Sequence, residues 1–242
     1  MKQKKSGPGN KHLPKDISIL YEDDDILVAV KPSGLLTMGT DRDKSRTLYA
    51  LLTDYVRKGY PKSAKRIFIV HRLDRDTSGI VIFAKTMEAK MKLQGRWEET
   101  GKTYIAVAHG RFEKREGTIS TFLAENKAHL VYSMNDASKG KLSHTAYRVL
   151  KDTKEFSLLE VNLLTGRKHQ IRVHLADIGH PVLGDNKYGK VKERYKRLAL
   201  HAKSISFIHP SSGKRLTFET GFPEYFNKLV ESKEQREGSE GK

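Results

Sequence analysis

Apolar and polar residues alternate along most of this chain with the two-residue period of β-strands. Short runs of this kind, rich in β-branched side chains and separated by polar turns, predict strands. The predicted strands cover residues 18–21, 26–30, 67–70, 79–84, 103–109, 118–123, 144–150, 156–163, 202–208 and 216–219.

Helical spacing occurs in three places. Apolar residues recur at helical intervals over 48–56, after the N-cap candidates Ser45 and Thr47. Residues 87–99 predict an amphipathic helix that ends at Gly101, and residues 170–178 predict a short helix closed by Gly179. Because strands outnumber helices and no regular strand–helix–strand rhythm is present, the pattern favours an α+β fold with a mixed, mainly antiparallel sheet and flanking helices.

The two ends of the chain differ from its middle. Residues 1–15 contain five lysines and no acid, which predicts a flexible basic arm, and the polar residues 231–242 predict a disordered tail. Neither a repeat nor a long linker interrupts residues 16–230. We therefore expect one continuous domain there.

Composition narrows the class of protein. The 242 residues carry 46 Lys and Arg against 29 Asp and Glu, a net charge of +17, which indicates a polyanionic partner. The absence of cysteine excludes disulfides, thiol nucleophiles and Cys-type metal sites. No apolar run approaches the roughly 18 residues of a membrane span, and the N-terminus lacks the apolar stretch of a secretory signal. We expect a cytoplasmic protein that has no membrane partner.

The segment 71–79, HRLDRDTSG, holds the densest candidate chemistry. Its second half is typical of a hydrogen-bonded turn. Asp74 differs, because it follows Leu73 at the end of a predicted strand, where a side chain can face a cleft. Arg72 would lie on the same side if the extended backbone continued. The pair is either a structural ion pair or a nucleophilic or basic carboxylate beside a cation that binds RNA.

A second candidate segment, residues 164–175, leads from a Thr-Gly turn into the predicted third helix. His169 and Arg172 are three residues apart and share a face, so with Arg167 they suit phosphate, although a solvated basic face has the same pattern. His169 and His174 do not share a face, and no metal-binding spacing is present. We predict no metal site.

Aromatic residues accompany the cations. Tyr104 lies in a predicted strand, where a tyrosine is either a packing residue or a platform for a base. Residues 186–203 hold seven Lys or Arg and two tyrosines, a pattern that suits looped RNA or a generic cationic loop.

Five segments, in order, resemble the motifs of the RluA-type pseudouridine synthase family. They lie at residues 21–35, 71–86, 102–110, 165–189 and 200–210. The resemblance extends from residue 18 to about 225. It implies the pseudouridine synthase fold with a central cleft, and the isomerisation of uridine to pseudouridine in structured rRNA or tRNA.

The resemblance also implies roles for individual residues. Asp74 matches the essential aspartate, Tyr104 the tyrosine that stacks on the target uracil, and Arg172 the arginine that pairs with the aspartate. The residues expected to contact the substrate are Lys31, Arg72, Arg167, His169 and Leu200. Since nothing is oxidised in the reaction, no cofactor is expected. We expect a monomer that binds RNA and not DNA.

Two other functions fit part of the pattern. A non-catalytic RNA-binding protein on a synthase scaffold would have the same charge and aromatic residues, but it would not need Asp74, Tyr104 and Arg172 together. A glycosidase would need two carboxylates about 5–10 Å apart, and Asp76 is better explained as a turn residue. Because the family motifs begin directly after the basic arm, substrate selection is expected to rest on the catalytic domain and that arm.

Overall fold

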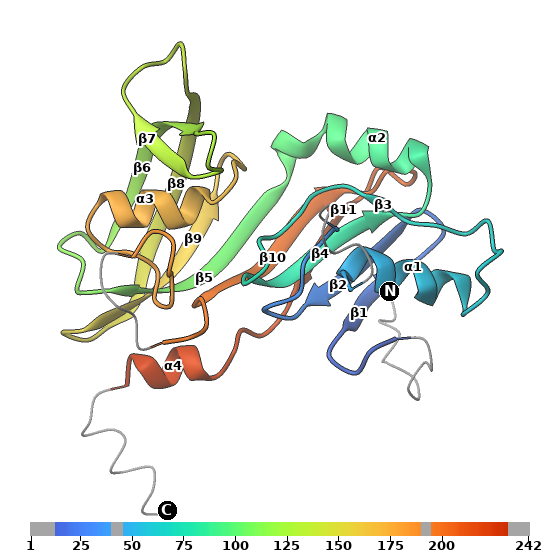
Figure 1. The fold of residues 1–242 in the computed structure, drawn as a ribbon, viewed down its shortest axis with the longest axis horizontal. Coiled ribbons are helices and arrows are strands. Elements are labelled where there is room, and N and C mark those ends of the chain that lie inside the picture. Colours follow the sequence, from blue (N-terminus) through green and yellow to red (C-terminus); the bar gives the residue numbers. More distant parts are fainter. Residues whose placement is uncertain (1–12, 40–45, 190–194, 232–242) are drawn as a thin grey trace, which may run out of the picture. The chain divides into compact units, whose positions relative to one another are not determined.

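The computed structural model describes residues 13–39, 46–189 and 195–231 (Figure 1). The chain forms two compact units, one of residues 1–101 with 204–220 and one of residues 102–203 with 221–242. The span predicted as one domain is thus divided between two units. The predicted arm and tail lie almost wholly outside the described residues.

The first unit is built on antiparallel strands. β2 (Ile26–Lys31) pairs with both β1 (Ser18–Glu22) and β4 (Ser78–Ala84), and β4 also pairs with the short β3 (Phe68–Ile69). β11 (Arg215–Glu219) pairs with the end of β10 (Leu200–Ile208). These positions agree with the two-residue period in the sequence, because alternating side chains of β2 and β4 enter the same core.

Two α-helices lie in the part of the first unit that the structure describes. α1 (Leu48–Arg57) begins at Thr47, whose hydroxyl accepts a hydrogen bond from the Ala50 N–H, as the sequence predicts. α2 (Met87–Gly95) is capped in the same way by Thr86. Ala89 and Leu93 of α2 pack into the core with residues of β2, β4 and β10. The predicted helix over 87–99 breaks after Gly95 and continues only as a 3₁₀ turn, η1 (Trp97–Glu99).

Among the described residues, the second unit contains five antiparallel strands in the order β5-β9-β8-β6-β7. Their bounds are β5 (Gly101–His109), β6 (Glu116–Glu125), β7 (Val131–Met134), β8 (Lys141–Asp152) and β9 (Phe156–Leu163). The sequence predicts all of them except β7. The mixed, mainly antiparallel α+β architecture is confirmed.

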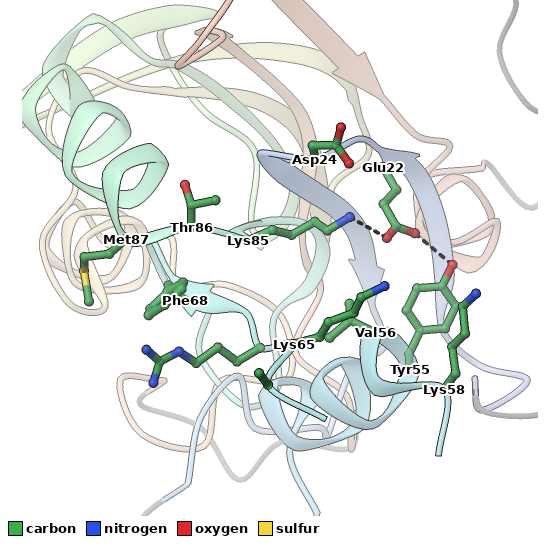
Figure 2. A pocket seen from close by; sticks show the side chains of 12 residues that line it. Glu22, Asp24, Tyr55, Val56, Lys58, Lys65, Phe68, Lys85, Thr86 and Met87 are labelled. Carbon is green, nitrogen blue, oxygen red and sulfur yellow. Dashed lines mark hydrogen bonds and ion pairs between the residues drawn. The ribbon is translucent and has the colours of Figure 1, made fainter. Parts of the chain in front are cut away.

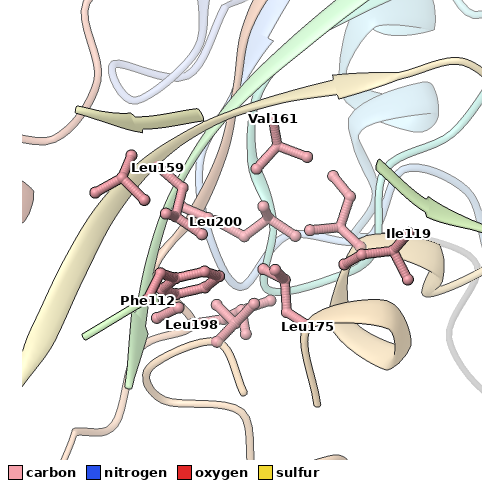
Figure 3. Packing of buried hydrophobic residues seen from close by; sticks show 12 residues of the cluster. Phe112, Ile119, Leu159, Val161, Leu175, Leu198 and Leu200 are labelled. Carbon is pink, nitrogen blue, oxygen red and sulfur yellow. The ribbon is translucent and has the colours of Figure 1, made fainter. Parts of the chain in front are cut away.

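Helix α3 (Gln170–Asp177) is joined to this sheet through a buried cluster (Figure 3). Leu175 of α3 lies among Leu159, Val161, Leu198 and Leu200. Burying each such side chain contributes about 1.5–3 kcal/mol, so this cluster fixes the position of α3 and of the polar residues that it carries. A short α4 (Tyr225–Leu229), which the sequence does not predict, packs its Phe226 against β5 and β9.

Within the part of the chain that the structure describes, none of the helices has both the length and the apolar character that crossing a membrane requires.

Candidate active site

Asp74 lies in an irregular loop between β3 and β4. β3 ends at Ile69, so the prediction that Asp74 ends a regular strand is wrong, and the argument that placed Arg72 on its side of the strand does not hold. Arg72 is exposed, Leu73 is buried and Asp74 is half-buried. The loop leaves the strand because its backbone is bound by other groups.

The residue before Asp74 is held by one hydroxyl. Thr37 donates from Oγ1 to the Leu73 carbonyl over 2.8 Å and accepts from the Leu73 N–H over 3.2 Å. Both residues are buried, which excludes water from these bonds. Thr37 therefore takes the place of a neighbouring strand at this position.

The residue after Asp74 is held by a buried lysine. The Lys31 ammonium donates to the carbonyls of Pro32 (3.0 Å), Leu35 (2.7 Å) and Arg75 (2.8 Å). Its side chain is fully buried, and burial lowers its pKa to about 8 although Asp76 and Asp74 act in the opposite direction. All three N–H donors are thus given to backbone carbonyls. Here Lys31 organises the loop and presents no donor to a ligand, unlike the substrate contact that the resemblance implies.

The turn after Lys31 adds three further bonds to the same loop. The Gly34 N–H donates to the Arg75 carbonyl (3.0 Å), Arg75 Nε donates to the Gly34 carbonyl (3.2 Å), and Ser33 Oγ donates to the Asp76 carbonyl (2.7 Å). Gly34 has a φ of 85°, which favours glycine. Two sequence motifs thus meet in space, and Asp74 stands between backbone groups held on both sides.

His71 ties the start of this loop to β4. The Ile82 N–H donates to His71 Nε2 over 3.0 Å, so the ring proton lies on Nδ1. The ring also stands 4.7 Å from that of Trp97.

Arg172, on α3 in the second unit, forms a bidentate ion pair with Asp185. Arg172 Nε lies 2.7 Å from Asp185 Oδ2, and Nη2 lies 2.8 Å from Oδ1. The Asp185 side chain is fully buried and that of Arg172 is 11% exposed. The guanidinium carbon also stands 5.1 Å from the ring centre of Tyr188. Arg172 is therefore held rigidly.

Asp185 is a candidate site residue that the sequence pattern did not reveal. Burial acts to raise its pKa, but the hydrogen bonds and charge of Arg172, with the N–H groups of Lys187 and Tyr188, hold that pKa below its ordinary value. It is therefore ionised at neutral pH. The available signal was an aspartate two residues after the apolar pair Val182–Leu183, where a buried acid requires a partner.

Tyr104 and His169 belong to the same unit as Arg172. Tyr104 stands on β5 opposite Val161 of β9, half-buried and packed against the core. His169 precedes α3 with a φ of 54°, and its Nδ1 lies 2.7 Å from the Tyr188 hydroxyl. His169 thus contacts the tyrosine on which Arg172 stacks.

The other two predicted substrate contacts differ in exposure. Arg167 is exposed, and its backbone N–H donates to Gln170 Oε1 over 3.0 Å. Leu200 is 4% exposed inside the cluster of Figure 3, where it packs and offers almost no surface to a ligand. The structure thus gives Lys31 and Leu200 internal roles and leaves Arg72 and Arg167 at the surface.

Asp74 lies in the first unit, whereas Tyr104 and Arg172 lie in the second. The expected pairing of Asp74 with Arg172 stays a prediction.

One cluster among the described residues has the composition of a metal site: Asp23, Asp25 and His209. His209 Nδ1 accepts from the N–H groups of Ser211 and Ser212, so its proton lies on Nε2 and is donated to Asp23 over 2.8 Å. In this arrangement neither ring nitrogen has a lone pair for a metal. The cluster is explained by its own hydrogen bonds.

Comparison with known proteins gives a consistent result. A sequence profile described as RNA pseudouridylate synthase matches residues 25–177, more than half of the chain. The dual-specificity RNA pseudouridine synthase RluA of Vibrio cholerae is 36% identical over 206 residues, which cover 82% of this chain and 81% of that protein. Ribosomal large subunit pseudouridine synthase C of Rickettsia bellii is 35% identical over 218 residues, which cover 87% and 70%.

A solved structure has the same fold. Human RNA pseudouridylate synthase domain containing 1 is 27% identical and superposes with a TM-score of 0.72 over 97% of each chain. The Asp74 loop, the residues that hold it (Lys31, Ser33, Gly34 and Thr37) and α3 all fall within the matched residues 25–177.

Proposed function

The chain belongs to the RNA pseudouridylate synthase family, and from this premise we propose that it isomerises specific uridines of structured rRNA or tRNA with Asp74 as the catalytic carboxylate. The assignment of Asp74 rests on the hydrogen bonds that hold its loop in place. Five hydrogen bonds hold the backbone on both sides of Asp74, and a sixth joins the Arg75 side chain to the Gly34 carbonyl. A carboxylate that must meet a sugar carbon at one fixed place needs such a support.

The reaction explains why a single carboxylate is required. The bond between ribose C1′ and uracil N1 breaks, the base turns over, and a bond forms between C1′ and C5 as the C5 proton leaves and N1 takes up a proton. Atoms and electrons balance without an oxidant. An ionised Asp74 would either attack C1′ or remove the C2′ proton, and both routes need a negative oxygen close to the ribose.

We propose that Arg172 forms an ion pair with Asp74. An arginine is always protonated in a protein, and charged hydrogen bonds from a guanidinium hold a carboxylate in a fixed orientation. Asp185 accepts from two of the five N–H donors of the guanidinium.

Tyr104 is proposed to stack on the everted uracil and to take its C5 proton. Removing the base from its stack costs a few kcal/mol, and stacking on an aromatic ring returns about 1–3 kcal/mol. The half-buried position of Tyr104 on β5 supports this role, because the packed ring loses little freedom when a base binds.

Mapping pseudouridines in total RNA from cells with and without the gene tests the function directly. We expect one or a few uridines of rRNA or tRNA to lose the modification, and purified protein to restore it in unmodified transcripts. An unchanged map, together with no product in transcripts, would overturn the proposal.

A further inference from the structure

A ten-residue segment at the C-terminal end of α1 forms a basic surface that the sequence analysis did not single out. Residues 57–66, RKGYPKSAKR, contain five cations and no acid. Lys58, Lys65 and Arg66 line a pocket of about 570 Å³ in the first unit (Figure 2). The Asp74 loop contributes no residue to this pocket, so the mechanism proposed above does not use it.

This basic segment has an ordered backbone. Lys58 ends α1 in the left-handed conformation, with a φ of 52°, and its N–H donates to the last carbonyls of the helix. Arg57 Nε donates to the Lys65 carbonyl over 3.1 Å, and the Ser63 N–H donates to the Tyr60 carbonyl over 3.0 Å. The cations therefore start from fixed backbone positions, which lowers the entropic cost of binding a ligand.

One of the two carboxylates of the pocket is neutralised from within. Glu22 accepts from Lys85 Nζ over 2.9 Å and from the Tyr55 hydroxyl over 2.9 Å, the two dashed contacts in Figure 2. Asp24 is the other carboxylate of the lining.

The remaining charge of the pocket is positive. Lys58, Lys65 and Arg66 are exposed, and within the described ranges none of them is paired with a carboxylate. Figure 2 shows that the ammonium groups of Lys58, Lys65 and Lys85 point toward the part of the pocket that Tyr55 and Glu22 line. Such an arrangement favours an anion.

Aromatic rings stand beside these cations. Tyr60 is 72% exposed, and the Arg66 guanidinium lies 5.1 Å from the ring centre of Phe68. An exposed tyrosine among unpaired cations is the combination that binds single-stranded nucleic acid, where phosphates meet the charges and a base stacks on the ring.

We propose that the 57–66 segment and the adjoining pocket bind the backbone of the substrate RNA outside the target nucleotide, with phosphates at Lys58, Lys65 and Arg66 and an unpaired base on Tyr60. The identity of the RNA as substrate rests on the proposed function. The site deepens that function by adding an electrostatic contact on the first unit that would select RNAs with a flanking single strand.

The test compares two triple variants with equal loss of charge. Lys58→Gln/Lys65→Gln/Arg66→Gln removes the surface. Lys114→Gln/Lys139→Gln/Lys154→Gln removes three exposed lysines of the second unit and serves as the matched control. The probe is a fluorescently labelled 40-nucleotide stem-loop with single-stranded uridine-rich flanks, and its Kd is measured between 50 and 300 mM salt.

We expect the surface variant to bind at least tenfold more weakly at low salt, and the slope of log Kd against log salt to fall by about 2 to 3, because each lost phosphate contact lowers it by about 0.7–0.9. The control should keep the wild-type slope. Tyr60→Ala should weaken binding by about 5- to 150-fold with little change in slope, since stacking carries no charge. Equal slopes for the two triple variants would overturn the proposal.

Two further measurements keep the result interpretable. Thermal unfolding should show wild-type midpoints for both variants, because all six side chains are exposed. Pseudouridine formation by the wild type tests the proposed function separately. If the wild type forms none, that function fails, while the difference in slope still decides whether the surface binds RNA.

Discussion

The buried ion pair of Arg172 with Asp185 fixes one of the three proposed catalytic side chains. Removing one partner of a buried pair leaves an uncompensated charge and typically costs about 3–5 kcal/mol. Asp185→Asn should therefore lower the free energy of unfolding by about 3 kcal/mol and reduce kcat at least tenfold in the folded protein. The RNA Kd should stay near that of the wild type.

The split between kcat and KM separates a positioning role of Asp185 from a purely structural one. If Asp185 positions Arg172 for the chemical step, Asp185→Asn should lower kcat in the folded protein with little change in KM. Asp136→Asn, which alters an exposed pair with Lys139, is the control and should change neither kcat nor KM. A folded Asp185→Asn protein with wild-type kcat would contradict this role.

Lys31 offers a second test at the scale of single residues. Lys31→Met keeps the approximate volume but removes the donors to the carbonyls of Pro32, Leu35 and Arg75. Buried carbonyls without partners are costly, so the turn and the Asp74 loop should separate locally. We expect kcat to fall at least tenfold with little change in KM, measured on one RNA at pH 7. If KM rises instead and kcat is unchanged, Lys31 acts on substrate binding.

Among the elements, α3 carries a buried histidine that makes stability depend on pH. His174 lies 2.9 Å from the Thr145 hydroxyl and 3.0 Å from that of Thr121, and burial lowers its pKa to about 4. The unfolded chain, with a histidine pKa near 6.5, binds a proton between pH 6.5 and 4 that the folded state does not. The free energy of unfolding therefore falls as the pH drops through this window, by about 2–3 kcal/mol.

Urea unfolding at pH 7 and pH 4.5 checks this dependence. His174→Gln should be less stable than the wild type at pH 7 but should lose less stability on acidification. Buried His201, whose pKa is also lowered to about 4, remains in this variant and retains part of the effect. His129→Gln, at an exposed position, is the control. An identical pH dependence in His174→Gln and the wild type would refute the assignment.

Elements defined by local signals were predictable from the sequence. The leucine spacing and the Thr47 cap place α1 correctly, and β9 coincides with its predicted range. β7 has only four residues and depends on pairing with β6, so its own sequence carries little signal. The predicted helix over 87–99 ends early because Gly95 is a poor helix former.

The candidate site was predictable only in part, because its contacts are long-range. The motifs pointed to Asp74, Tyr104 and Arg172, but the bond from Lys31 to Arg75 joins residues 44 positions apart, which no local pattern shows. The family resemblance implied substrate contacts for Lys31 and Leu200, whereas both side chains are buried and have internal roles here. Asp185 was missed because its partner Arg172 lies on another element.

In the whole molecule, the proposed catalytic residues and the proposed RNA-binding surface are divided between the two units. The net charge of +17 favours RNA, the first unit carries Asp74 and the basic 57–66 segment, and the second carries Tyr104 and Arg172. RNA binding and turnover should therefore respond to different substitutions, so the catalytic role of Asp74 can be tested by measuring both on one variant.

Asp74→Asn is that variant, because it keeps the size of the side chain and removes only its negative charge. Pseudouridine formation is measured in a transcript that the wild type modifies, with RNA affinity measured in parallel and Asp76→Asn as the neighbouring control. We expect no product from Asp74→Asn at wild-type RNA affinity, and turnover retained by Asp76→Asn. Product formed by Asp74→Asn at a rate near that of the wild type would exclude Asp74 as the catalytic carboxylate.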